Sequence, residues 1–269
     1  MPKTWKFLYS GEGDPFFNLA LDEVLFFENQ KGGSSPIFRI YGWGKAAISI
    51  GYFQNVSRAC NQAECQKQNL PIIRRITGGR AVFHQKDLTY CLVGSSDLYP
   101  ELGHNVMETY NKTSQAFLEG LKMLGVEGSW EKGKLSAHDK KSSLPCFSSA
   151  SVYEVTHLGK KLIGSAQKRV GSWFIQQGSL PLNSDAERQK NFLSDGNNSD
   201  NGFEKKFTNL EEILARTVPL QELAAVFKSA WEKFWNVNFS EMELTTQLIN
   251  QTQDLVQSKY SQNDWNYLK

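Results

Sequence analysis

Apolar side chains recur every three or four positions in three stretches of the chain. The first covers residues 15–27, the second covers residues 105–124 and ends at Gly125, and the third follows Pro219. This spacing places the apolar side chains on one face of a helix. The proline and glycine fit the start and end of a helix. We therefore predict three amphipathic helices.

Shorter runs rich in β-branched and aromatic residues predict strands. Residues 37–41 and 46–52 form two such runs, joined by the sequence Gly-Trp-Gly-Lys at 42–45. Two strands separated by a short glycine-containing turn are typical of a β-hairpin. We interpret residues 37–52 as a hairpin.

A second hairpin is predicted in the middle of the chain. Residues 152–155 and 162–163 are mostly apolar and flank the sequence Thr-His-Leu-Gly-Lys at 156–160. Further strand patterns occupy residues 87–93 and 173–182. Strands and helices mixed along the chain in this way predict an α/β (α+β) fold, in which mixed sheets are flanked by helices.

The apolar content of the sequence falls after residue 182. Residues 183–206 contain few apolar side chains and include the run Asp-Gly-Asn-Asn-Ser-Asp-Asn-Gly, which is typical of a loop or linker. The remainder has helical patterns. We expect a main domain of residues 1–206 and a small helical segment of residues 207–269 packed on it.

Composition narrows the class of protein. Hydrophobic residues make up 40% of the 269 residues, enough for a sizeable core. Thirty basic and 28 acidic residues give a net charge of +2, so overall charge provides no attraction to nucleic acid. Neither a secretory signal nor an apolar run of about eighteen residues occurs. We expect a cytoplasmic protein without a membrane or nucleic-acid partner.

The chain has four cysteines, and none belongs to a C-x-x-C pair: Cys60, Cys65, Cys91 and Cys146. In a reducing compartment we expect free thiols. The first three lie within helical or strand patterns, and we interpret them as packing residues. The fourth follows a proline and a lysine-rich stretch, and Lys161 opens the return strand of the second predicted hairpin.

A thiol beside an ammonium group has a definite chemistry. The thiolate is the nucleophile, and a neighbouring positive charge lowers the thiol pKa towards working pH. If the hairpin forms, the preceding chain can fold back and bring Cys146 to Lys161. The alternative is a buried structural cysteine and a solvated lysine, and the spacing alone leaves both open.

A glycine pair marks a second candidate site. The sequence Thr-Gly-Gly-Arg at 77–80 follows arginines at 74 and 75 and precedes another strand pattern. Adjacent glycines allow positive φ and close backbone approach, which fits either a ligand-binding loop or a tight turn. No G-x-G-x-x-G, no G-x-x-x-x-G-K-[ST] and no H-E-x-x-H occurs. We predict no cofactor and no metal site.

Several motifs resemble a known superfamily when they are taken together and in order. They are Asn18-Leu-Ala-Leu-Asp22-Glu23, Phe38-Arg39-Ile-Tyr41-Gly-Trp43, Ser49-Ile-Gly51-Tyr-Phe-Gln54, Arg74-Arg-Ile-Thr-Gly-Gly-Arg-Ala-Val-Phe-His84, Gly159-Lys-Lys-Leu-Ile-Gly-Ser-Ala-Gln167, Gln177-Gly-Ser179 and Asp264-Trp265-Asn266. This set resembles the biotin/lipoate protein ligase superfamily. Pro145-Cys146-Phe147 with Tyr153-Glu154 resembles its cysteine-dependent octanoyl-[acyl carrier protein]:protein N-octanoyltransferases, the branch related to lipoate–protein ligase A.

The resemblance implies a two-step acyl transfer in lipoate biosynthesis without a cofactor. Cys146 would attack octanoyl-acyl carrier protein to give an octanoyl-enzyme thioester. A lysine of a lipoyl carrier domain, such as glycine cleavage H protein or a dehydrogenase E2, would then accept the octanoyl group. Lys161 matches the lysine of the family and would bind the acyl carbonyl and assist proton transfer.

The motifs also imply substrate-binding residues. They are Arg74, Thr77, Gly78, Gly79, Arg80, His84, Gly164, Ser165 and Ala166. The glycine segment would form a wall of the acyl pocket, while the resemblance gives His84 no defined role.

Three alternative functions remain. An ATP-dependent lipoate–protein ligase would share the fold and turn the arginines at 74, 75 and 80 towards an adenylate. An amidotransferase between carrier domains would share the cysteine and the lysine. A non-catalytic protein that binds acyl groups or lipoyl domains is a third possibility. Since a ligase needs no nucleophilic cysteine, Cys146 favours the transferase.

Basic residues gather in the sequence around Cys146. They are Lys132, Lys134, Lys140, Lys141, Lys160, Lys168 and Arg169. Such a cluster would steer an acidic carrier protein to the site, or it would be an ordinary solvated rim. We expect charge reversal at Lys140 and Lys141 to raise the apparent KM for acyl carrier protein at low salt.

Overall fold

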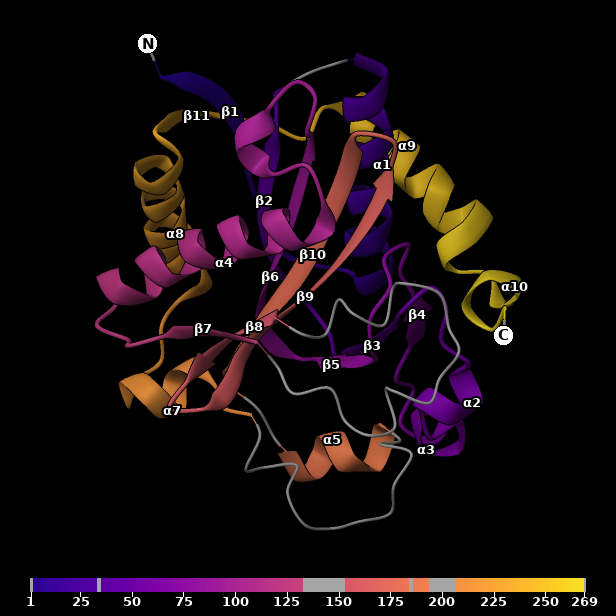
Figure 1. Ribbon diagram of the computed structural model, residues 1–269. Coiled ribbons are helices and arrows are strands. Elements are labelled where there is room, and N and C mark those ends of the chain that lie inside the picture. Colours follow the sequence, from indigo (N-terminus) through magenta and orange to yellow (C-terminus); the bar gives the residue numbers. More distant parts are fainter. Residues whose placement is uncertain (1, 33–34, 133–152, 184–185, 194–206, 269) are drawn as a thin grey trace.

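The computed structural model describes residues 2–32, 35–132, 153–183, 186–193 and 207–268. Within these ranges an eight-stranded mixed sheet forms the centre of the molecule, in the order β11-β1-β2-β6-β10-β9-β8-β7 (Figure 1). A second, three-stranded sheet in the order β4-β3-β5 lies beside it. Cys146 and the lysines at 134, 140 and 141 lie outside the described residues. The mixed α/β architecture agrees with the prediction.

The strands of the large sheet are β1 (Lys3–Gly13), β2 (Ile37–Trp43), β6 (Lys86–Ser95), β7 (Ser129–Lys132), β8 (Tyr153–His157), β9 (Lys160–Val170), β10 (Trp173–Asn183) and β11 (Val237–Glu241). Those of the small sheet are β3 (Ala47–Ile50), β4 (Ile72–Arg74) and β5 (Val82–His84). In the large sheet β1 runs parallel to both β2 and β11, and the other neighbours are antiparallel.

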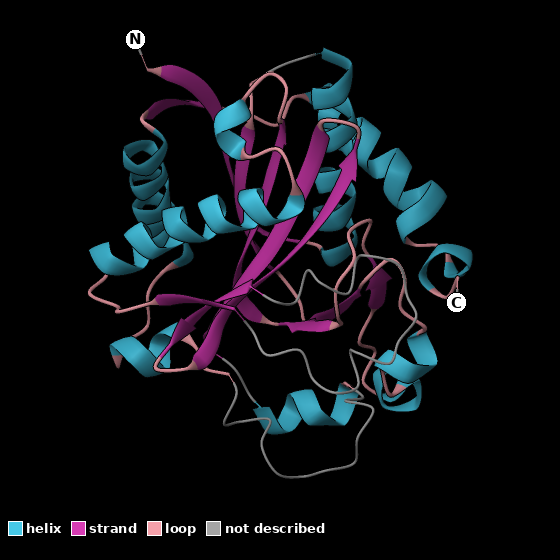
Figure 2. Ribbon diagram, in the orientation of Figure 1, coloured by secondary structure: helices cyan, strands magenta, loops and turns pink. Residues whose placement is uncertain are grey.

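Helices cover both faces of the large sheet (Figure 2). One face carries α4 (Val106–Met123) and α8 (Leu220–Trp235), and the other carries α1 (Pro15–Gly32) and α9 (Thr246–Leu255). Within the described residues the other helices are α2 (Val56–Ala59), α3 (Gln62–Lys67), η1 (Pro100–Leu102), α5 (Ala186–Phe192), α7 (Leu210–Leu214), η3 (Val256–Tyr260) and α10 (Asn263–Asn266). The three helices predicted from apolar spacing are confirmed as α1, α4 and α8. None of the described helices is long and apolar enough to cross a membrane.

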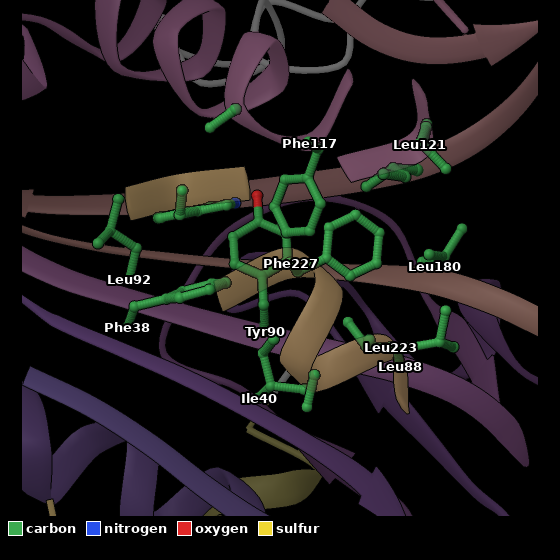
Figure 3. Packing of buried hydrophobic residues seen from close by; sticks show 14 of the residues in the cluster. Phe38, Ile40, Leu88, Tyr90, Leu92, Phe117, Leu121, Leu180, Leu223 and Phe227 are labelled. Atoms are coloured by element: carbon green, nitrogen blue, oxygen red, sulfur yellow. The ribbon is translucent and has the colours of Figure 1, made fainter. Parts of the chain in front are cut away.

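Aromatic side chains fill the core between the large sheet and helices α4 and α8 (Figure 3). The ring of Phe38 stacks on Trp231 with centroids 3.6 Å apart. Gly120 on α4 lets the two helices approach closely, because a Cβ there would lie 2.4 Å from the ring of Phe227. Full burial of side chains this large contributes roughly 2–3 kcal/mol each relative to exposure in water.

The second predicted hairpin is confirmed, and the first is wrong. Strands β8 and β9 pair directly across the turn at Leu158 and Gly159. In contrast, β2 pairs with β1 and β6 in the large sheet, while β3 pairs with β4 and β5 in the small sheet. The side chain of Asn18 donates to the carbonyl of Gly42 at 2.9 Å, where the chain leaves the large sheet. The glycine-containing segment therefore carries the chain from one sheet to the other.

The C-terminal segment contains the predicted helices and also a strand that the patterns did not predict. Strand β11 extends the large sheet beside β1, with Val237 opposite Lys3. Arg74 binds the last of the described helices, since its backbone N–H donates to Asn266 Oδ1 at 2.9 Å. The segment therefore contributes both a strand and a helix contact to the rest of the fold.

Candidate active site

A β-bulge sets the direction of the Lys161 side chain. Val155 on β8 pairs with Ile163 on β9, but the next residue, Thr156, pairs with Lys161. The inserted residue is Leu162. One extra residue reverses the alternation of side chains beyond it. Leu162 and Ile163 consequently both join the core below α4, and the Lys161 side chain passes over Gly164, where a Cβ would lie 3.1 Å from its Nζ.

The backbone of Lys161 is paired on both sides. One side faces Thr156 of β8, and the other side forms a parallel bridge with Phe207. The carbonyl of Lys161 accepts a hydrogen bond from the N–H of Thr208 at 3.0 Å. Since both edges of the backbone are held, the position of the ammonium depends mainly on side-chain rotamers.

The glycine segment lies next to this lysine. Gly164 and Ala166 share one face of β9 because side chains alternate along a strand. Gly79 packs on that face: it has a φ of 89°, and a Cβ there would lie 3.3 Å from Cβ of Ala166. The segment is therefore a tight turn with a left-handed residue, packed on the same face of β9 as Gly164, and its predicted binding of a ligand stays a prediction.

The Arg75 side chain fixes the shape of the glycine segment from inside. Its Nη2 donates to the carbonyls of Gly78 at 2.7 Å and Arg80 at 2.8 Å. Its Nε donates to Oγ1 of Thr77, and its Nη1 donates to the carbonyl and hydroxyl of Ser49. These five hydrogen bonds use a buried guanidinium to hold a turn together.

Thr77 connects the segment to a buried ion pair. Its hydroxyl donates to Oε1 of Gln177 at 2.8 Å, and Nε2 of Gln177 donates to Oδ2 of Asp22. Asp22 also accepts from Arg39, and both of these side chains are fully buried. The hydroxyl of Tyr41 is a further donor to Asp22. A buried pair of charges costs little free energy only when it is hydrogen-bonded as completely as this one.

His84 lies in a buried chain of hydrogen bonds instead of at the surface. Its Nε2 is 2.8 Å from the hydroxyl of Ser49, and its Nδ1 is 2.8 Å from Oδ2 of Asp87. Its ring stacks on Trp43 with centroids 3.9 Å apart. Burial raises the pKa of the Asp87 carboxyl, but His84 and the hydroxyls of Ser179 and Thr89 outweigh that effect, so the pKa lies below its usual value.

Arg74 holds the C-terminal helix. Its side chain donates to the carbonyls of Gly51, Tyr52, Gln54, Trp265 and Asn266. Burial is the main reason that its pKa is lowered. These contacts favour a structural contribution for this predicted substrate-binding residue. Arg80 is exposed, at the outer end of the glycine segment.

Ser165 lies on the opposite face of β9 from Gly164 and Ala166. Its hydroxyl is 2.7 Å from that of Tyr90, within the core below α4. Burial raises the pKa of Tyr90 to about 12, so this phenol stays neutral. Gly178 makes the contact possible, because a Cβ there would lie 2.3 Å from the Tyr90 ring. The structure therefore separates Ser165 from the two neighbours with which it was predicted.

Residues 14–232 match the family described as the lipoyl protein ligase A/B catalytic domain. The chain belongs to this family. Octanoyltransferase LipM of Bacillus subtilis is 34% identical, and that of Carboxydothermus hydrogenoformans is 33% identical, each over 98% of both chains. A putative lipoate protein ligase from T. acidophilum, solved with bound lipoic acid, aligns with a TM-score of 0.79 at 22% identity, over 98% of this chain and 99% of that one. The resemblance drawn from the motifs, including its octanoyltransferase branch, is confirmed.

In this member of the lipoyl ligase A/B family, two residues of the predicted basic cluster, Arg169 and Lys160, bind other residues of the protein. Arg169 donates to the carbonyls of Gly103 and Asn105 and to Thr109, so it holds the start of α4. Lys160 pairs with Glu212 at 3.6 Å. Arg169 therefore has a structural role at the start of α4, and Lys134, Lys140 and Lys141 of the predicted steering cluster lie outside the described residues.

The three cysteines in the described part of this family member are buried. Burial raises the pKa of Cys60 to about 12 and that of Cys65 to about 11. Burial also raises the pKa of Cys91 well above its usual value. All three are neutral thiols at physiological pH, as packing residues should be. No group of His, Cys, Asp or Glu among the described residues is arranged to hold a metal ion.

Sequence reasoning missed the buried residues that support the site. Ser49, Gln177 and Asp22 stood in the recognised motifs but received no role, and Asp87 was named only as the start of a strand. Each is a polar residue in or beside an apolar strand or helix pattern. A polar residue that is buried needs a partner, and this requirement is the signal that would have identified them.

Proposed function

We propose that this chain transfers an octanoyl group from octanoyl-acyl carrier protein, through a thioester on Cys146, to a lysine of a lipoyl carrier domain. The relatives named octanoyltransferase match along nearly the full length of the chain. The observation that carries the proposal is that Lys161 lies over Gly164 on the face of β9 that packs against Gly79. This contact supports a single site that contains both Lys161 and the glycine segment.

The first step exchanges one thioester for another. The thiolate of Cys146 attacks the acyl carbonyl, the bond to the pantetheine sulfur breaks, and that sulfur leaves as a thiol after it takes a proton from the Lys161 ammonium. Lys161 supplies a positive charge beside the carbonyl, where it stabilises both the thiolate and the negative oxygen of the tetrahedral intermediate. The exchange is close to thermoneutral because the same kind of bond forms and breaks.

The second step makes the amide. The amine of the acceptor lysine attacks the thioester carbonyl, the Cys146 sulfur leaves, and the amine loses a proton. The Lys161 amine, left neutral by the proton that it gave up in the first step, lies at Gly164, and we assign it the uptake of this proton. Conversion of a thioester to an amide is downhill, so neither step requires ATP.

The arginines favour the transferase over an ATP-dependent ligase. A ligase would direct the arginines at 74, 75 and 80 towards an adenylate. The guanidinium of Arg74 donates to five backbone carbonyls, and that of Arg75 donates to the glycine segment and Ser49. Two of the three arginines are thus committed to the protein itself.

Intact mass spectrometry tests the proposal directly. The protein is incubated with octanoyl-acyl carrier protein without ATP, in wild-type form and as Cys146→Ala and Lys161→Ala variants. We expect a hydroxylamine-labile gain of one octanoyl group on the wild type, none on Cys146→Ala, and a slow gain on Lys161→Ala. Addition of apo H protein should discharge the adduct. An adduct that appears only with ATP and free octanoate or lipoate would establish the ligase instead.

A further inference from the structure

We propose that Arg75 is a positioning residue, held by Ser49 and the His84–Asp87 pair, which turns the backbone N–H groups of Gly78 and Gly79 towards the oxygen of the reacting acyl group. This inference rests on the proposed octanoyl transfer and adds the source of oxyanion stabilisation. It also gives His84 a role, which the motif left undefined.

Carbonyl contacts show how the glycine segment is oriented. The carbonyl of Thr77 accepts from the N–H of Tyr52 at 2.9 Å, and that of Gly78 accepts from Nη2 of Arg75 at 2.7 Å. The carbonyl of Gly79 points at Gly51, since a Cβ there would lie 2.1 Å from its oxygen. Every carbonyl from 77 to 79 thus faces the protein.

In a trans peptide the N–H points opposite to the carbonyl of the same unit. The peptides that end at Gly78 and Gly79 are trans, as are the others in the described chain. Their N–H groups therefore point away from Tyr52 and Arg75. No described group accepts a hydrogen bond from either of them. Successive N–H groups that point to one side form an anion-binding concavity.

The concavity lies beside Lys161. Gly79 packs on Ala166, and the Lys161 ammonium lies over Gly164, two residues earlier on the same face of β9. Two residues along a strand span roughly 6 to 7 Å. An acyl oxygen between these positions would be within reach of both the ammonium and the glycine amides. Backbone donors of this kind, fixed before the reaction, stabilise a developing oxyanion.

Arg75 can hold the glycine segment in this orientation because the Arg75 side chain is itself held by hydrogen bonds. Its Nη1 donates to the Ser49 hydroxyl at 3.1 Å, and that hydroxyl lies 2.8 Å from Nε2 of His84. The Asp87 carboxylate accepts from Nδ1 of His84 at 2.8 Å. If the ring proton of His84 is on Nδ1, the Ser49 hydroxyl donates to Nε2 and leaves its lone pairs to Arg75. Each donor in the chain then has an acceptor.

The Ser49→Ala variant tests the proposal with the smallest change. It removes one hydroxyl that contacts both Arg75 and His84. We expect the kcat for acyl-enzyme formation to fall roughly 10- to 100-fold, by analogy with oxyanion donors in other enzymes. The KM for octanoyl-acyl carrier protein should change less than about threefold, because the glycine N–H groups act on the transition state more than on the bound substrate. The control is Ser95→Ala, the same substitution at a buried serine whose hydroxyl donates to Ser172.

A spectroscopic measurement separates positioning from stability. The octanoyl-enzyme thioester is prepared with a ¹³C carbonyl, and its stretching frequency is recorded by isotope-edited infrared spectroscopy. Hydrogen bonds to the oxygen lower this frequency, so we expect a higher frequency in Ser49→Ala than in wild type and Ser95→Ala. An unchanged frequency and an unchanged kcat in Ser49→Ala would overturn the positioning role alone. Absence of any octanoyl adduct on the wild type would overturn the proposed function and this inference together.

Discussion

The Lys161 ammonium lies so close above Gly164 that a methyl group at residue 164 would come within 2.8 Å of Cε and 3.1 Å of Nζ. The bulge at Leu162 places the two residues on the same face of β9. The absence of a side chain at residue 164 is therefore part of the arrangement that positions the ammonium.

Gly164→Ala should reduce activity much more than stability. The added methyl displaces the flexible end of Lys161, which costs little folding free energy but moves the ammonium by about an ångström. Misplacement on that scale lowers rates about 100-fold. Acyl-enzyme formation and thermal unfolding measure the two effects. Gly32→Ala is the control, since nothing lies within 4 Å of a Cβ there. Activity within twofold of wild type would contradict this explanation.

The two glycines of the segment at 77–80 should respond differently to alanine. Gly79 has a φ of 89°, and its Cβ would lie 2.8 Å from Nη2 of Arg75. We expect Gly79→Ala to lower the free energy of unfolding by about 2 kcal/mol, from backbone strain and displacement of the arginine. No atom lies within 4 Å of a Cβ built at Gly78. The free energy of unfolding of Gly78→Ala should therefore lie within about 0.5 kcal/mol of the wild-type value. Urea unfolding of the two variants provides the comparison, and equal losses would refute it.

The buried cysteines should not react in the native state. Because burial raises the pKa of Cys60 to about 12 and that of Cys65 to about 11, both are protonated at pH 8, where the thiolate is the reactive form. Brief treatment with iodoacetamide at pH 8 should modify Cys146 and leave the other three cysteines unmodified. Peptide mass spectrometry identifies the modified residues, and Cys146→Ala should remain unmodified. Rapid labelling of Cys60 or Cys65 would show that these thiols are accessible.

The turn between β8 and β9 contains an unusual residue. Leu158 has a φ of 47° and is 85% exposed. A left-handed conformation costs a residue such as leucine roughly 1 kcal/mol, whereas asparagine followed by glycine is favoured in this kind of turn. Leu158→Asn should therefore raise the free energy of unfolding by about 0.5–1 kcal/mol. Leu98→Asn is the control, because Leu98 is also exposed but has no positive φ. If both variants gain the same free energy of unfolding, the gain comes from removal of an exposed apolar side chain and not from the backbone conformation of residue 158.

The sequence predicted those helices and strands that depend only on neighbouring residues. The helices α1, α4 and α8 and the β8–β9 hairpin each follow from spacing and turn residues within a short stretch. The link between β2 and β3 has the same pattern as a hairpin, and only the partners of each strand distinguish the two. Strand β11 was missed for the same reason, since its partner is β1 at the other end of the chain.

In the candidate site, too, residues within one motif were predicted and contacts between distant residues were not. Lys161 and the glycine segment were found because their motif is contiguous. The supporting contacts, such as Thr77 with Gln177 and Ser49 with His84, join residues far apart in the sequence. A hydrogen bond between distant residues leaves no periodicity along the chain. Such a bond becomes predictable only once the strands that carry the residues are aligned.

The contact between Arg74 and Asn266 joins residues separated by 192 positions. During synthesis at roughly 5–20 residues per second, about 10 to 40 seconds pass between the addition of the first residue and that of the second. Throughout that interval the Arg74 guanidinium lacks two of its five carbonyl partners, Trp265 and Asn266, because these residues have not yet been added. The loop at Gly51, against which the glycine segment packs, therefore reaches its final form late, and a nascent chain contains Lys161 well before all the partners of Arg74 have been added.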